Sequence, residues 1–114
     1  MGNENVILKK SYEFAVRIVR MYQHLSKEKK EYMLSKQVLR SGTSIGANAE
    51  EAVGGISKAD FKAKMSISYK EAYWLRLLHD TGYLDSDVFN SIRADLTELL
   101  KILYTIIKSS SNNH

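Results

Sequence analysis

The amino-acid sequence predicts an all-α protein, an antiparallel up-down-up-down four-helix bundle that forms one domain over residues 1–114. Apolar residues recur in steps of three and four in four successive segments, which is the spacing of one helix face. The chain contains no proline, and the connections between the segments are short, so successive helices should pack as antiparallel neighbours. The expected helices cover about residues 5–26, 30–54, 58–81 and 86–108.

The first expected helix carries one apolar row with alternating steps of four and three residues. Such a row is the seam along which the helices of an antiparallel bundle pack. The row consists of Ile7, Ser11, Phe14, Ile18, Met21 and Leu25, with Ser11 as its one polar member.

The second expected helix is rich in small residues. A glycine inside a helix costs about 1 kcal/mol relative to alanine and usually allows another backbone to come close. Gly42 and Gly46 share one face, where we expect close packing against a helix of the same or a neighbouring subunit. Asn48 lies on the core-facing row and is expected to fix register or oligomeric state rather than bind a ligand. The row comprises Leu34, Val38, Ser41, Ile45, Asn48 and Ala52.

Capping residues delimit the last two expected helices. Ser57 with Asp60 resembles a capping box before the third helix, and Gly82 is a suitable stop after it. Asp85 or Ser86 is expected to cap the fourth helix. The third helix has the row Phe61, Met65, Ser68, Ala72, Leu75 and His79. The fourth has the row Phe89, Ile92, Leu96, Leu99, Leu103 and Ile106, beside a second stripe of Val88, Leu100, Ile102 and Ile107.

The residue types and their spacing argue against the common catalytic and metal sites. The chain has no cysteine, which excludes disulfides, thiolate catalysis and zinc sites of the cysteine type. No glutamate has a histidine three residues later, and no phosphate-binding glycine loop occurs. We therefore expect a protein without enzymatic activity, cofactor, metal or small-molecule substrate. His79 is expected to be a hydrogen-bonded residue at a helix end.

The sequence also predicts a cytoplasmic protein that does not enter a membrane. No apolar run approaches the about 18 residues of a membrane span. The first ten residues do not resemble a signal peptide, because an acid comes first and only three apolar residues stand together.

Positive charge is concentrated in the first three expected helices. The formal net charge is +4, and residues 1–40 hold nine Lys and Arg against four Glu. Residues 77–114 hold three Lys and Arg against five acids. A basic surface of this kind favours the phosphates of RNA or DNA, although a merely solvated surface has the same composition. The residues expected to contact a nucleic-acid backbone are Lys9, Lys10, Arg17, Arg20, Lys36, Arg40, Lys62 and Lys64.

Three aromatic residues, Tyr69, Tyr73 and Trp74, lie close together on the third expected helix, with Lys and Arg near them. Aromatic rings among cations can stack nucleobases while the cations hold phosphates. Tyr and Trp are also common in cores and at interfaces between subunits. We favour the interface, because the apolar surfaces of several helices exceed the needs of a monomeric bundle.

Three segments carry a family resemblance: RSGTSIGANAEEA at residues 40–52, FKAKMSISYKEA at 61–72 and YWLRLL at 73–78. Over residues 6–108 the chain resembles the bacterial four-helix-bundle proteins encoded in intervening sequences of 23S ribosomal RNA genes. The resemblance implies a homopentamer. Accessory proteins of diversity-generating retroelements share that architecture, and they present a basic surface to nucleic acid and to a reverse transcriptase.

The third helix departs from the family pattern, which has about four more residues between Ala72 and Tyr73. Losing four residues rotates the rest of the helix by about 40° only, so the apolar seam should survive in a helix shorter by about 6 Å. The sequence as a whole therefore predicts a non-enzymatic homo-oligomer that binds RNA or DNA non-specifically. The alternative is a protein-interaction scaffold or an accessory subunit, for example of a reverse transcriptase, that does not bind nucleic acid directly.

Overall fold

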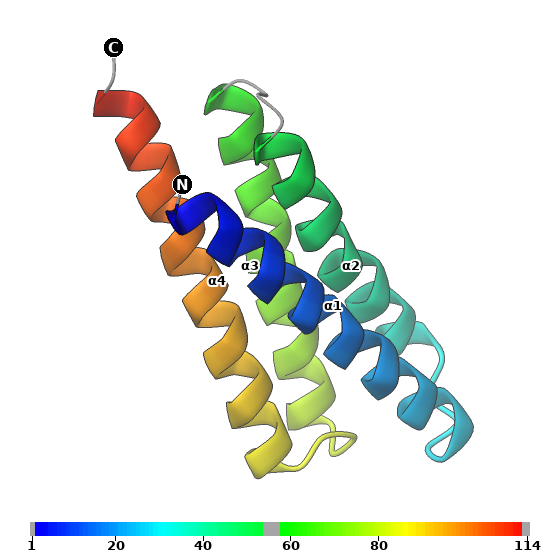
Figure 1. The fold of residues 1–114 in the computed structure, drawn as a ribbon. Helices are drawn as coiled ribbons and strands as arrows, with labels where there is room; N and C mark the ends of the chain where they lie inside the picture. Colours follow the sequence, from blue (N-terminus) through cyan, green and yellow to red (C-terminus); the bar gives the residue numbers. More distant parts are fainter. Residues whose placement is uncertain (1, 54–57, 113–114) are drawn as a thin grey trace.

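The structure, a computed structural model, describes residues 2–53 and 58–112, and the side chains of residues 6–50 and 66–106. Its four helices are α1 (Gly2–Lys27), α2 (Met33–Val53), α3 (Lys58–Asp80) and α4 (Ser86–Asn112), which confirms the all-α prediction. In Figure 1 successive helices run in opposite directions. Each helix packs against its neighbours along the chain, and α1 also packs against α4. None of the described helices has the length and apolar character that crossing a membrane requires.

The turn between α1 and α2 is shaped by two residues. Lys30 has a left-handed backbone with φ of 56°, which ends α1 in the way that glycine commonly ends a helix. The N–H of Glu31 then donates to the carbonyl of Leu25 at 3.0 Å. The buried Glu31 carboxylate caps α2, because it accepts hydrogen bonds from the backbone N–H groups of Met33, Leu34 and Ser35 at 3.2, 3.1 and 2.7 Å. Helix α2 therefore begins at Met33, whereas the sequence predicted a start at about residue 30.

The turn between α3 and α4 follows the prediction. Gly82 has a φ of 89°, and the N–H groups of Gly82 and Tyr83 donate to carbonyls of the last turn of α3 at 3.0 and 2.9 Å. Asp85 caps α4, since its carboxylate accepts the N–H of Val88 at 2.8 Å. The expected capping box at Ser57 lies outside the described residues.

The apolar rows of α1 and α4 form the larger part of the core, as predicted. Every row residue of α1, including Ser11, is buried, and so is every row residue of α4 except the partly buried Ile106. Leu100 and Ile102 of the second stripe also pack against the core, while Val88 is exposed. Helix α4 therefore leaves less apolar surface uncovered than its sequence predicts.

The expected rows of α2 and α3 are partly wrong. In α3, Glu71 and Leu78 are fully buried, whereas the expected Ala72 and His79 are only partly buried. In α2, Ala49 is buried and the expected Asn48 only partly so. At each of these positions the buried residue is the one next to the expected residue, which is a rotation of about 100° around the helix. The side chains of Ala52, Phe61 and Met65 are outside the described part.

The most unusual packing feature of the bundle is the contact between Gly42 of α2 and Glu71 of α3. Glu71 is 0 % exposed, and a Cβ atom at position 42 would overlap its Oε2 atom. The same Cβ would lie 3.0 Å from two carbons of Ile18 on α1. Glycine at position 42 therefore makes room for a carboxyl group between three helices. Gly46 faces α1, where a Cβ would meet the Ser11 carbonyl oxygen at an ordinary contact distance of 3.5 Å.

Gly42→Ala is expected to lower the free energy of unfolding by about 1–3 kcal/mol, because the new methyl group overpacks this site. The gain in helix propensity, about 1 kcal/mol, does not offset the overlap. Gly46→Ala is the matched control, and it should keep or raise stability. Urea unfolding of both variants checks this expectation. In a Glu71→Ala background the cost of Gly42→Ala should fall, and equal effects at positions 42 and 46 would contradict the packing argument.

Candidate functional site

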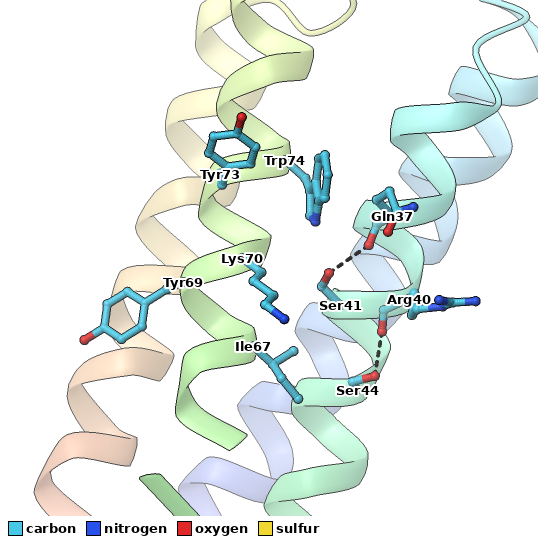
Figure 2. Close-up of a pocket in the computed structure, with 9 residues that line it drawn as sticks. All are labelled: Gln37, Arg40, Ser41, Ser44, Ile67, Tyr69, Lys70, Tyr73 and Trp74. Atoms are coloured by element: carbon cyan, nitrogen blue, oxygen red, sulfur yellow. Dashed lines mark hydrogen bonds between the residues drawn. The ribbon is translucent and has the colours of Figure 1, made fainter. Parts of the chain in front are cut away.

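A groove runs between α2 and α3, with a volume of about 580 Å³. It gathers a residue expected to bind nucleic acid, Arg40, and the three aromatic residues of α3. Figure 2 shows the Trp74 ring and the Lys70 side chain extending from α3 toward α2. Arg40 and Tyr69 lie at the rim and point away from the opposite helix. The lining residues are Gln37, Arg40, Ser41, Ser44, Ile67, Tyr69, Lys70, Tyr73 and Trp74.

The groove carries positive charge without a compensating acid. Its described lining contains the cations Arg40 and Lys70 and no Asp or Glu. Both cations are exposed, and neither forms an ion pair within the described part of the chain. The hydroxyl groups of Ser41 and Ser44 on α2 donate to backbone carbonyls of their own helix at 2.8 and 2.7 Å, so their oxygen atoms remain available as acceptors.

The aromatic side chains of the groove are arranged edge to face. The ring centroids of Tyr73 and Trp74 lie 5.3 Å apart, at an interplanar angle of 73°. The guanidinium of Arg76 lies 5.7 Å from the Tyr73 ring centroid, within reach of a cation–π interaction. Trp74 is partly buried against the core, while Tyr69 and Tyr73 are exposed. The groove thus combines aromatic surface that is open to solvent with the two cations Arg40 and Lys70, and Arg76 lies beside it over the Tyr73 ring.

A second groove lies beside the turn between α3 and α4 and has a volume of about 470 Å³. Its cationic lining residues are Arg17, Arg20 and Lys29, with His24 beside them and Asp85 as an acid. Arg17 is not a free cation, because its Nη1 atom donates to Asp95 of α4 at 2.8 Å. This groove is therefore less cationic than its count of bases implies.

The other residues expected to bind nucleic acid are dispersed. Lys10 pairs with Glu98 of α4 at 3.0 Å, and this hydrogen bond and charge raise the pKa of Lys10 above its usual value. Lys9 and Lys36 are exposed on α1 and α2. Lys62 and Lys64 belong to α3, but their side chains lie outside the described part of the structure. Among the expected nucleic-acid-binding residues whose side chains are described, Arg40 alone lies with the aromatic residues.

Comparison with known proteins places this chain in a family. The sequence pattern of the 23S rRNA-intervening sequence proteins matches residues 3–105. The chain belongs to this family. Among curated proteins no match was found.

One solved structure shares this fold over most of the chain. It is a protein of unknown function from the S23 ribosomal protein family of Bacteroides thetaiotaomicron, with 49% sequence identity and a TM-score of 0.85. The match covers 93% of this chain and 98% of that one. Neither description names an enzymatic activity.

The groups that could support catalysis or metal binding are few in this family member. Within residues 6–50 and 66–106, no three His, Cys, Asp or Glu side chains are grouped as a metal site requires. His79 lies 3.0 Å from Asp80 and 3.1 Å from the Ser86 hydroxyl, and its ring stacks on Phe89 at 4.3 Å. This confirms the prediction of a hydrogen-bonded histidine at a helix end.

Glu71 is the ionisable group that sequence reasoning missed. Neither carboxyl oxygen has a hydrogen-bond partner among the described residues, and burial raises the pKa of Glu71 to about 9. The group is therefore neutral at physiological pH. The sequence held a signal for it, because Ser68, Glu71, Leu75 and Leu78 also follow steps of three and four. Sequence reasoning overlooks this row, because a carboxyl group is not expected at a core position.

Glu71 should make the bundle less stable as the pH rises. Below pH 4.5 both folded and unfolded chains hold the proton. Between pH 4.5 and about 9 the unfolded chain releases it while the folded chain retains it, so stability falls with rising pH. Above about pH 9 both folded and unfolded chains have released the proton, so stability falls no further. Glu71→Gln removes this effect and should differ little from the parent at pH 4. At pH 8 it should be more stable by about 4–5 kcal/mol, because each pH unit above 4.5 costs the parent about 1.4 kcal/mol.

Urea unfolding of the parent and Glu71→Gln over pH 4–9 measures this difference. Glu50→Gln, which changes an exposed glutamate of α2, is the control and should follow the parent at every pH. Parallel curves for the parent and Glu71→Gln would show that the carboxyl group is not held neutral by the fold.

Proposed function

We propose that the protein is a non-enzymatic homo-oligomer that binds RNA or DNA with little sequence preference through the basic surfaces of α1, α2 and α3. The proposal rests on one observation above all. Of the Lys and Arg side chains described on these three helices, only Lys10 and Arg17 form ion pairs. The remaining positive charge faces solvent and is available to phosphates.

The acids of α4 account for this distribution. Asp95 and Glu98 pair with α1, at the seam between the first and last helices. Both pairs are about half exposed, so water screens them and each contributes little to stability. The cations of α2 and the groove face of α3 lie elsewhere and keep their charge. Lys36, Arg40 and Lys70 are the described members of this set.

Assembly into an oligomer is the second part of the proposal. The sequence pattern supports it through the family resemblance, and the structure adds exposed apolar side chains such as Met33, which is 80% exposed. An oligomer repeats each weak phosphate contact, and linked weak contacts bind more tightly than separate ones. A ring of protomers would therefore strengthen the binding of a long polyanion.

Fluorescence anisotropy with labelled RNA and DNA should show micromolar binding at low salt that weakens steeply as salt rises, because phosphate neutralisation releases counterions. Arg20→Glu combined with Lys36→Glu should weaken binding by about tenfold or more and lower the salt dependence. The control is Arg93→Glu combined with Lys101→Glu, which changes net charge equally on α4. Arg17 is unsuitable because its substitution also breaks the pair with Asp95.

If an assembled protein binds neither RNA nor DNA at low salt, the nucleic-acid part of the proposal fails. Equal losses of affinity in the α1–α2 variant and the α4 control would instead indicate a response to net charge, without a defined surface.

Light scattering should give a mass several times the 13.0 kDa of one chain at micromolar concentration, with the pentamer as the expected state by family resemblance. A mass close to 13.0 kDa would contradict assembly. This measurement precedes the binding experiments, since avidity depends on the assembled state.

A protein-interaction scaffold is the second candidate, and the tyrosines favour it. Six of the seven tyrosines have exposed side chains: Tyr12, Tyr32, Tyr69, Tyr73, Tyr83 and Tyr104. Tyrosine is enriched where proteins contact one another, because it offers a large apolar ring with a polar tip. Assembly without any nucleic-acid binding would leave this candidate in first place.

A further inference from the structure

We propose that the groove between α2 and α3 binds an unpaired nucleotide of a single strand, with its base against the aromatic side chains and its phosphate near Lys70. This inference rests on the proposed function and adds to it the class of substrate, single-stranded nucleic acid. The basic surfaces alone would hold a duplex and a single strand alike, since both present phosphates.

Charge complementarity selects this groove among the grooves that the structure describes. The second groove includes Asp85, and a smaller one near the α1–α4 seam includes Glu13, Asp95 and Glu98. The α2–α3 groove has Arg40 and Lys70 and no acid in its described lining. In Figure 2 the Lys70 ammonium extends toward the α2 wall, and the Arg40 side chain stands at the rim. A phosphodiester can therefore approach without repulsion.

The aromatic geometry provides a place for a base. Tyr73 and Trp74 stand at 73° to one another, so their contact covers at most one face of one ring. A planar base can lie against a face that the pair leaves uncovered, as bases do on aromatic residues that bind single strands. Arg76 beside Tyr73 holds that ring in place through its cation–π contact. Gln37, Ser41 and Ser44 of α2 line the opposite wall of the groove.

The size and the chemistry of the groove favour a single strand. Its volume of about 580 Å³ falls within the range of about 300–1,000 Å³ that is typical of sites for small ligands, such as one nucleotide. Stacking on a side chain needs a base whose face is free, and inside a duplex both faces are covered by neighbouring base pairs. A duplex would therefore contact the basic surface without filling the groove.

Trp74 is the only tryptophan of the chain, so its fluorescence reports on this groove directly. The parent protein is titrated at low salt with three probes of about 12 nucleotides: an unstructured single strand as RNA and as DNA, the blunt duplex, and an abasic strand with the same phosphates. The single strand should quench Trp74 fluorescence. The duplex and the abasic strand should bind, as seen by anisotropy, with little quenching.

Two variants and their controls test the roles of the side chains. Tyr73→Ala and Lys70→Gln should each weaken single-strand binding by about five- to tenfold, with a smaller effect on the duplex. Tyr104→Ala and Lys101→Gln change an exposed tyrosine and an exposed lysine of α4, and they should leave both affinities unchanged. Circular dichroism confirms that each variant keeps its helices.

The outcomes separate this inference from the proposed function. If no probe binds, the proposed function itself fails. If all probes bind equally, without quenching and without an effect of Tyr73→Ala, nucleic-acid binding stands and the groove proposal is overturned. If Tyr73→Ala instead lowers the assembled mass and the single strand does not quench Trp74, the groove is an interface between copies of this chain, which also overturns the proposal.

Discussion

The packing of α1, α2 and α3 is arranged around one buried carboxyl group that has no hydrogen-bond partner among the described residues. Glu71 lies between α1, α2 and α3 and is fully buried. Burying a charged carboxylate without a partner would cost too much free energy, so the carboxyl group keeps its proton. Room for it exists because α2 has glycine at position 42, where any side chain would collide with the carboxyl oxygen. The close approach of three helices and the protonation of Glu71 are therefore parts of the same constraint.

The sequence predicted most of the fold because the apolar rows of α1 and α4 contain only one polar residue, Ser11. The seams of α1 and α4 follow steps of three and four, and the structure buries them. Gly82 and Asp85 have the backbone roles that their residue types indicate. The errors lie in α2 and α3, because their expected rows include several polar residues and so define the buried face less clearly. The structure buries the residue next to the expected one at three positions of these helices. Glu71 in particular could not be placed, because a carboxyl group at a core position contradicts the pattern that identifies a core.

The candidate site was only partly accessible to sequence reasoning. Spacing along α3 placed Tyr69, Tyr73 and Trp74 together, but their juxtaposition with Arg40 depends on how α2 packs beside α3. Ion pairing is equally invisible in the sequence. Lys10 and Arg17 look the same as the other basic residues until α4 is placed beside α1. Tertiary packing thus decides which positive charges of the chain remain available.

The α1–α4 seam has a consequence for how the protein responds to its ionic environment. The two ion pairs that cross this seam are about half exposed, so water and dissolved salt weaken them. Their separations of 3.0 and 2.8 Å are shorter than the screening length of about 10 Å at 0.1 M, so the effect of salt is small. Because α1 and α4 are the first and last helices, they are joined only through the other two and through this contact. The buried apolar residues of α1 and α4 are not subject to screening, and they hold the first and last helices together at any ionic strength. A change in salt therefore reaches the surface charges of this protein while its helical packing stays closed.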